Sequence, residues 1–135
     1  MADADGAEGA GDTDLELRTL VVKCTAGADD LERCSQAFTV ATTALASGAD
    51  VSLWLTGEAA WLAVAGRAEA VELAHAAPLA DLRDALLVAE AVTVCTQCAA
   101  RRGITEADLL PGARIAGSAS FVDEVLRPSV QALVY

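Results

Sequence analysis

The sequence predicts an α/β sandwich with a mostly parallel sheet, and three observations lead to this fold class. Short runs rich in β-branched residues alternate with segments of helical periodicity along the chain. The 135 residues are 54% hydrophobic, which is enough for the core of one domain. Glycine, proline and aspartate stand at the junctions between the segments. Strands that alternate with helices are expected to pair in parallel, because each helix returns the chain across the sheet.

The folded part is expected to open with a strand at residues 17–24, whose apolar and β-branched side chains suit the centre of a sheet. Asp29 or Asp30 can then cap a helix that runs to about residue 47. Apolar residues recur in this helix at spacings of three and four, so one of its faces is predicted to be buried. Cys34 lies on that face.

Gly48 ends the helix, and residues 51–55 follow as a second predicted strand. A turn then leads into a short helix at residues 58–65, which carries Trp61. The next segment, residues 66–77, fits a loop, an extension of that helix or a short strand. The sequence pattern leaves these three alternatives open.

Pro78 suits the first position of the next helix, because a proline there gives up an N–H group that would have no partner. A central strand is predicted after it at residues 92–95. The helix that follows this strand is expected to end at Gly103. Thr105 and Asp108 resemble a capping box for one further helical turn.

The last part of the chain repeats the alternation. Residues 113–116 are predicted to form a strand, and Ser118 can cap a helix that runs to about residue 127. Pro128 stops this helix, and residues 130–134 give the final strand.

The formal charge is −11, and the first sixteen residues hold six acids and no base, in a setting of Ala and Gly. We expect residues 1–16 to be a disordered acidic tail and residues 17–135 to be the folded domain. The remaining fourteen acids and nine bases give a net charge of −5. With 4% aromatic residues and no basic stripe, this surface would repel a phosphate backbone, so we expect no nucleic-acid partner.

No apolar stretch reaches about 18 residues without an interruption by Asp, Glu, Arg or Gly, so we expect no membrane span and no membrane partner. The N-terminus lacks a basic region followed by an apolar one, and we therefore expect no secretory signal. These features predict a cytoplasmic, thiol-reducing location. In that setting the four cysteines are interpreted first as reactive, metal-binding or buried residues, before a disulfide framework is considered.

The most informative stretch is residues 92–103, where a β-branched run ends at Cys95 and a helix is expected to begin. This junction puts Cys95 at or near the N-cap and Cys98 three residues later, close to unpaired N–H groups and to the positive end of the helix dipole. A C-x-x-C at such a junction can lower a cysteine pKa from about 8.5 to about 7 or below. We therefore predict Cys95 and Cys98 as catalytic residues.

Binding residues are expected beside them, because reactive groups gather at the carboxyl edge of open parallel sheets. Cys24, Thr56 and Cys95 each end a predicted strand, so Cys24 and Cys95 would share one edge if their strands are neighbours. Trp61 could line the same site, although a large aromatic side chain more often contributes to core packing or to a subunit contact. His75 could reach the site as a base, but it also fits an ordinary loop residue.

A family resemblance rests on three runs of residues. Val-Cys-Thr-Gln-Cys-Ala-Ala-Arg-Arg-Gly-Ile, with Gly-Ala-Asp-Val-Ser-Leu-Trp-Leu upstream and Gly-Ser-Ala-Ser-Phe downstream, resembles the DsrE/DsrF-like family, which includes the TusD sulfur-relay proteins. The resemblance covers residues 17–135 and implies a three-layer sandwich with about five mainly parallel strands and helices on both faces. It also implies homotrimers, or hexamers built from trimers, that exchange sulfur with donor and acceptor proteins. By the same resemblance Cys95, six residues before the Arg-Arg-Gly element, carries sulfur as a persulfide.

One departure from the sulfur-relay pattern leaves the function open. Cys98 stands where those members typically carry a small apolar residue, and a second thiol would attack a persulfide or sulfenic acid on Cys95 and release the sulfur. An alternative hypothesis is therefore a thiol-disulfide or peroxide redox protein, with Cys95 attacking and Cys98 resolving. Another is a non-catalytic, oligomeric ligand-binding domain whose cysteines are buried hydrophobic residues.

The other chemistry-bearing residues suggest less. Arg101 and Arg102 are predicted to add positive charge beside the thiolate only if their loop folds back, and otherwise to form a solvated helix end. A metal site of Cys95, Cys98 and Cys24 would lack the second close pair of a structural zinc site, so we expect no metal. Motifs for nucleotide binding, acyl transfer and zinc proteolysis are missing from the sequence, and no cofactor is expected.

Overall fold

The structure is a computed structural model that describes residues 18–135. The acidic tail predicted for residues 1–16 lies outside this range. None of the helices between residues 18 and 135 is long and apolar enough to cross a membrane. In chain order the elements are β1 (Thr19–Cys24), α2 (Leu31–Ala46), β2 (Asp50–Leu55), the 3₁₀ helix η1 (Gly57–Ala63), α3 (Leu79–Val88), β3 (Val92–Cys95), α4 (Thr96–Arg101), the 3₁₀ turn η2 (Glu106–Asp108), β4 (Ala113–Ala116), α5 (Ser118–Val125) and β5 (Val130–Val134).

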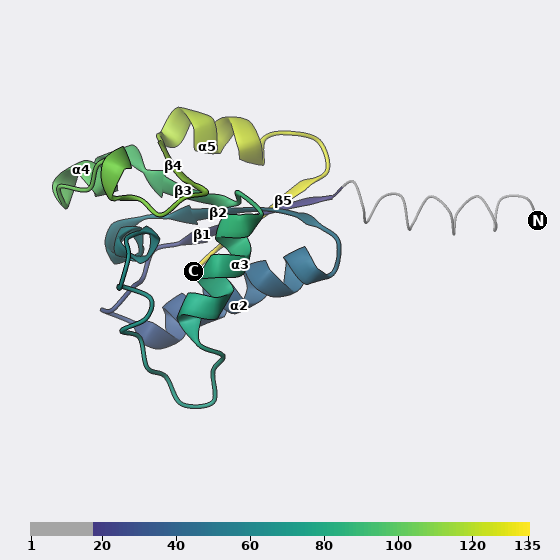
Figure 1. Ribbon diagram of the computed structural model, residues 1–135. Helices are drawn as coiled ribbons and strands as arrows, with labels where there is room; N and C mark the ends of the chain where they lie inside the picture. The colour runs from purple at the N-terminus through teal and green to yellow at the C-terminus, as the bar shows by residue number, and fades with distance from the viewer. Residues whose placement is uncertain (1–17) are drawn as a thin grey trace, which may run out of the picture.

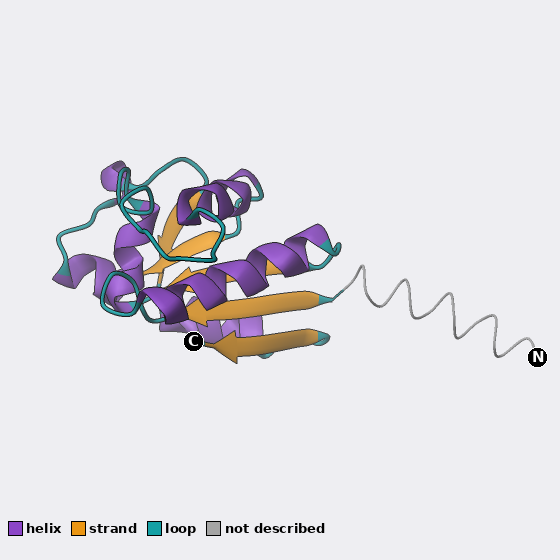
Figure 2. Ribbon diagram, turned by 90° about the horizontal axis from the view of Figure 1, so that it is seen from below, coloured by secondary structure: helices purple, strands orange, loops and turns teal. Residues whose placement is uncertain are grey.

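The five strands form one parallel sheet in the order β4-β3-β2-β1-β5. Helices α2 and α3 cover one face of this sheet and α5 covers the other (Figure 1). Figure 2, seen from the side of α2, shows this helix running along the strands. The predicted three-layer α/β sandwich with a five-stranded parallel sheet is thereby confirmed.

Helix α2 binds the sheet through the apolar stripe that the sequence predicted. The Asp30 carboxylate accepts a hydrogen bond of 3.2 Å from the Arg33 N–H group, so Asp30 is the N-cap. Cys34 and Phe38 are fully buried against the sheet, where they meet core residues such as Leu53. Burial of a large apolar side chain contributes about 1.5–3 kcal/mol, so this face supplies much of the stability of the domain.

Three local predictions differ from the structure. The helix expected at residues 58–65 is the 3₁₀ helix η1, and residues 66–77 form turns and loop, which settles the alternatives left open for that segment. Pro78 is the N-cap of α3 and not its first residue. Gly117 is the N-cap of α5, so Ser118 begins this helix without capping it. Helix α5 therefore begins one residue earlier than expected, directly after the extended backbone of Gly117.

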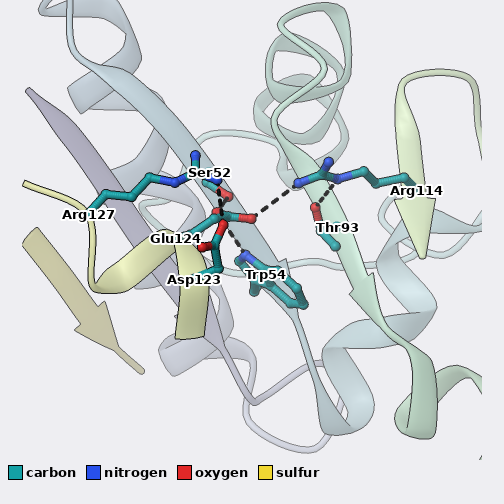
Figure 3. A network of polar contacts seen from close by, with 7 residues as sticks. All are labelled: Ser52, Trp54, Thr93, Arg114, Asp123, Glu124 and Arg127. Carbon is teal, nitrogen blue, oxygen red and sulfur yellow. Dashed lines mark hydrogen bonds and ion pairs between the residues drawn. The ribbon is translucent and has the colours of Figure 1, made fainter. Parts of the chain in front are cut away.

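The α5 face of the sheet is held by polar contacts (Figure 3). No residue of α5 is fully buried. The Glu124 carboxylate accepts hydrogen bonds from the Ser52 hydroxyl at 2.5 Å, the Trp54 indole N–H at 3.2 Å and the Arg114 guanidinium at 3.2 Å. Arg114 also donates to the Thr93 hydroxyl at 2.9 Å. These contacts fix α5 above the sheet although its apolar contact with the core is small.

Candidate functional site

Cys95 lies at the carboxyl edge of the sheet, where it is the last residue of β3 and the N-cap of α4. Its side chain is half-buried, whereas the other three cysteines are buried. The next two residues, Thr96 and Gln97, are exposed. A reagent that approaches this edge from solvent therefore meets the Cys95 sulfur before any other thiol of the chain.

The surroundings of Cys95 favour its thiolate. Burial has the largest single effect and raises the pKa of the thiol, because it removes water from the charged form. Four opposing interactions outweigh burial and bring the pKa of Cys95 below its usual range: the N–H group of Cys98, the thiol of Cys98, the N–H group of Gln97 and the charge of Lys23. Neither N–H group makes a full capping hydrogen bond to the sulfur. The thiolate is therefore stabilised by several partial interactions together.

Cys98 lies in α4, three residues after Cys95, and its side chain is part of the core. Its side chain is 9% exposed, and its sulfur accepts a hydrogen bond of 3.2 Å from the N–H group of Gly57. Gly57 has a φ of +54°, and a Cβ atom there would lie 2.8 Å from the Thr25 carbonyl oxygen. Only glycine fits this close approach, so the turn after β2 is shaped to present an N–H group to Cys98. The two thiols of the C-x-x-C thus have different environments.

Arg102 folds back onto the structure, whereas Arg101 is exposed. The Arg102 guanidinium forms an ion pair of 2.8 Å with Glu58 and donates a hydrogen bond of 3.1 Å to the Cys98 carbonyl. The carbonyl of Cys98 is one of the last acceptors of α4, so Arg102 stabilises the C-terminal end of this helix. Because Glu58 balances its charge, Arg102 connects α4 to η1 and adds little positive field at Cys95.

The structure does not bring Cys24 and Cys95 together. Strand β2 lies between β1 and β3, so the strands of the two cysteines are not neighbours. Cys24 is in register with Leu55, which is in register with Val94, and all three side chains belong to the same buried core. Cys95 is one residue further and points to the other side by the alternation of a strand. A shared site for Cys24 and Cys95 was expected only if their strands are neighbours, and in the structure they are not.

Cys24 instead forms a thiol pair with Cys34 of α2, which the sequence analysis missed. Both side chains are fully buried, and the Cys24 thiol donates a hydrogen bond of 3.1 Å to the Ala26 carbonyl. Contact between the two thiols is the largest influence on each: it lowers the pKa of Cys24 and raises the pKa of Cys34. Their burial keeps this pair away from solvent, so it belongs to the core.

The other predicted binding residues have structural partners. The Thr56 hydroxyl is buried and donates to the Cys24 carbonyl at 3.4 Å. Trp61 is half-buried, and the Arg67 guanidinium lies 3.9 Å above its ring centroid. His75 is exposed in a loop and lines an open groove of about 960 Å³ beside α2, and none of the residues that line this groove belongs to the Cys95 site.

Between residues 18 and 135, no three His, Cys, Asp or Glu side chains gather as metal ligands.

Lys23 was not singled out in the sequence as a residue of the Cys95 site. Lys23 is the single lysine of the chain, and its charge acts on the Cys95 thiol. Its place one residue before the end of a predicted strand was the available signal, since that end was already expected at the carboxyl edge of the sheet.

These features define a class: small α/β proteins with a parallel five-stranded sheet and an accessible cysteine where a central strand meets a helix. The chain belongs to the DsrE/DsrF-like family, whose model matches residues 19–129. It is 32% identical over 117 residues to the uncharacterized protein MJ0760 of Methanocaldococcus jannaschii, a match that covers 86% of this chain and 42% of that protein. The chain therefore spans less than half the length of this relative.

Two solved structures share the fold. The YchN protein from E. coli superposes with a TM-score of 0.71 at 17% sequence identity, covering 88% of this chain and 99% of that one. MTH1491 from Methanobacterium thermoautotrophicum, described as a protein of unknown function, superposes with a TM-score of 0.59 at 12% identity and the same coverage. At these identities the likeness concerns the fold alone.

Proposed function

We propose that the protein is a cysteine-dependent sulfur carrier of the DsrE-like family, in which Cys95 is the nucleophile and holds sulfur as a persulfide. The observation that carries this proposal is the state of the Cys95 thiol. It is the accessible cysteine of the four, it lies at the carboxyl edge of the sheet, and its surroundings lower its pKa. Cysteine chemistry proceeds through the thiolate, so these three properties select Cys95 for reaction near neutral pH.

The transfer requires no change in total oxidation state. The Cys95 thiolate attacks the outer sulfur of a donor persulfide, a new S–S bond forms at Cys95, and the donor's S–S bond breaks with loss of the donor thiolate. An acceptor nucleophile then attacks the outer sulfur on Cys95, and the Cys95 thiolate leaves. In each step the N–H groups of Gln97 and Cys98 favour negative charge on the Cys95 sulfur.

A second candidate function is a thiol redox protein, favoured by the contact between the Cys98 thiol and the Cys95 sulfur. A peroxide would oxidise the Cys95 thiolate to a sulfenic acid. The Cys98 thiol would then attack the Cys95 sulfur, forming a disulfide and releasing water. With a persulfide on Cys95, the same attack would release hydrosulfide and leave the same disulfide.

Mass spectrometry of the intact protein separates the two functions. Wild type, Cys95→Ala and Cys98→Ala are incubated briefly with a persulfide donor and, separately, with a mild peroxide. Gain of one sulfur atom in wild type and Cys98→Ala, but not in Cys95→Ala, would support the sulfur carrier. Loss of two hydrogen atoms that needs both cysteines, without a stable sulfur adduct, would support the redox protein. Absence of both changes would contradict both functions and favour a ligand-binding domain.

Partners and location are part of the proposal. We propose a homo-oligomer, trimer or hexamer, that exchanges sulfur with donor and acceptor proteins in the thiol-reducing cytoplasm. Support comes from α5 and the edge strand β5, where Val122, Leu126 and Val134 are 48%, 77% and 66% exposed. A second copy could cover these apolar side chains. Light scattering after size-exclusion chromatography should give a multiple of the chain mass, and Leu126→Glu should lower it.

A further inference from the structure

Lys23 is a half-buried cation on the α5 side of the sheet, near the carboxyl end of β1. Within residues 18–135 no carboxylate lies at ion-pair distance from its ammonium group. The ammonium lies instead above the ring of Phe121, 5.1 Å from the ring centroid. An aromatic face attracts a cation at this distance without cancelling its charge, whereas a carboxylate would neutralise it.

The ring that holds Lys23 is itself fixed. Phe121 packs edge-on against Trp54, with ring centroids 5.3 Å apart and an interplanar angle of 84°. Trp54 is 2% exposed, and its indole N–H group is bonded to Glu124 (Figure 3). Helix α5 and strand β2 therefore determine together where the Lys23 ammonium lies.

The register of the sheet relates Lys23 to Cys95. Lys23, Trp54 and Thr93 lie side by side on β1, β2 and β3. Adjacent strands are about 4.8 Å apart, and Cys95 follows Thr93 by two residues on the same face. Lys23 and Cys95 thus share the α5 side of the sheet near its carboxyl edge.

The other charged groups around this face are balanced. Arg114, which is in register with Thr93 on β4, is paired with Glu124, and Arg102 is paired with Glu58 at the end of α4. Lys23 is the side-chain charge that acts on the Cys95 thiol, and its effect lowers the pKa.

We propose that Lys23 is a positioning residue for Cys95: its ammonium group, held above the Phe121 ring, stabilises the negative charge that the Cys95 sulfur carries. For the thiolate this inference does not depend on the proposed function: it rests on the shared face of the sheet and on the unpaired ammonium held by Phe121. For the persulfide it rests on the proposed function, because a persulfide anion has its charge on the outer sulfur of the same side chain. The cation then favours both the attacking form of Cys95 and its loaded form.

The test measures the rate of Cys95 alkylation by iodoacetamide against pH in the full chain, with the labelled residue identified by peptide mass spectrometry. Lys23→Gln removes the charge, Lys23→Arg keeps it, and Phe121→Leu removes the ring that holds it. Arg33→Gln removes an exposed positive charge on α2 and serves as the matched control.

We expect Lys23→Gln to move the midpoint of the profile to higher pH and to slow alkylation at pH 7 by about two- to fivefold, the range for one partly solvated charge. Phe121→Leu should move the midpoint in the same direction by less, while Lys23→Arg and Arg33→Gln should keep the wild-type profile. Added salt screens the lysine charge, so it should make the alkylation rates of wild type and Lys23→Gln more alike. Superimposable profiles for wild type and Lys23→Gln would overturn the inference, and so would a Lys23→Arg profile like that of Lys23→Gln.

This outcome is independent of the proposed function. If wild type takes up no sulfur but Lys23→Gln still shifts the alkylation profile, the sulfur carrier is wrong and the role of Lys23 on the thiolate stands. If sulfur uptake depends on Cys95 and the profiles coincide, the sulfur carrier stands and the role of Lys23 is wrong.

Discussion

The protein holds two pairs of cysteines, one in the core between β1 and α2 and one at the junction of β3 and α4, and they differ in the exposure of one thiol. The Cys24 pair, Cys24 with Cys34, is fully buried between β1 and α2. The Cys95 pair, Cys95 with Cys98, lies where β3 meets α4, and Cys95 is half-buried. Cys24 and Cys95 are both the last residues of parallel strands, so position at a strand end does not decide reactivity.

The difference comes from side-chain direction and from the distance to the following helix. Cys24 points toward α2, and six residues separate it from Leu31, where that helix begins. Cys95 points toward the face of the sheet that α5 covers, and α4 begins at the next residue. The same thiol is therefore a core residue at the end of one strand and a thiolate site at the end of another. Four substitutions would break or sharpen this comparison.

The largest expected effect is that of Cys95→Ser. We expect it to reduce total thiol alkylation of the folded protein near neutral pH by about tenfold or more, because the remaining thiols are buried. A colorimetric thiol assay under native conditions measures this rate. Cys34→Ser is the matched control and should leave the rate unchanged. Equal rates for wild type and Cys95→Ser would contradict the assignment of reactivity to Cys95.

The turn that supports Cys98 offers the next test. Gly57→Ala should destabilise the fold by about 2–3 kcal/mol, because a Cβ atom would lie 2.8 Å from the Thr25 carbonyl in a backbone of positive φ. Gly66→Ala is the control, since its φ is also positive but no atom lies within 4 Å of the added carbon. Urea unfolding should show the smaller loss for Gly66→Ala. A loss at Gly57 no larger than at Gly66 would show that the close approach is relieved easily.

Cys34→Ser should lower the free energy of unfolding by about 1–2 kcal/mol, because it puts a hydroxyl group into a fully buried, mainly apolar site. Denaturant unfolding measures the change. Cys95 alkylation in the folded variant should remain as in wild type. If Cys34→Ser also slowed Cys95 alkylation at a temperature where the variant is folded, the two pairs would be coupled and the comparison would fail.

Cys98→Ala should have the smallest effect, a rise in the midpoint of the Cys95 alkylation profile. The Cys98 thiol helps to lower the pKa of Cys95, so its removal reduces the thiolate fraction at any pH below the midpoint. We expect alkylation at pH 7 to slow by about two- to threefold, a change of roughly 0.5 kcal/mol. Cys24→Ala is the control and should leave the profile unchanged. A midpoint that falls in Cys98→Ala would mean that the thiol opposes the thiolate.

The sequence predicted the strands and most helix boundaries because these depend on local patterns. Each of the five predicted strand ranges matches an observed strand, and the N-caps of α2 and α4 are Asp30, one of the two predicted candidates, and Cys95. The N-cap of α5 was missed by one residue, since Gly117 and Ser118 both suit that position.

The arrangement of the cysteines was less predictable, because strand order is not a local property. The sequence could not show that β2 separates Cys24 from Cys95, and so their shared edge remained conditional. Lys23 and Phe121 lie 98 positions apart and meet only through the packing of α5 on the sheet. Both features depend on the order of the strands and on the packing of α5 against the sheet, and no single segment of the sequence determines these.

The central claim is that position at the strand-to-helix junction makes Cys95 the reactive thiol of the chain. Competitive labelling tests it most directly: wild-type protein is treated for increasing times with a limiting isotope-coded alkylating reagent at pH 7, then unfolded and labelled fully, and each cysteine is quantified by peptide mass spectrometry. We predict that Cys95 is labelled first and that Cys24, Cys34 and Cys98 react only after unfolding. Labelling of Cys24 or Cys34 in the folded protein as fast as Cys95 would contradict the account.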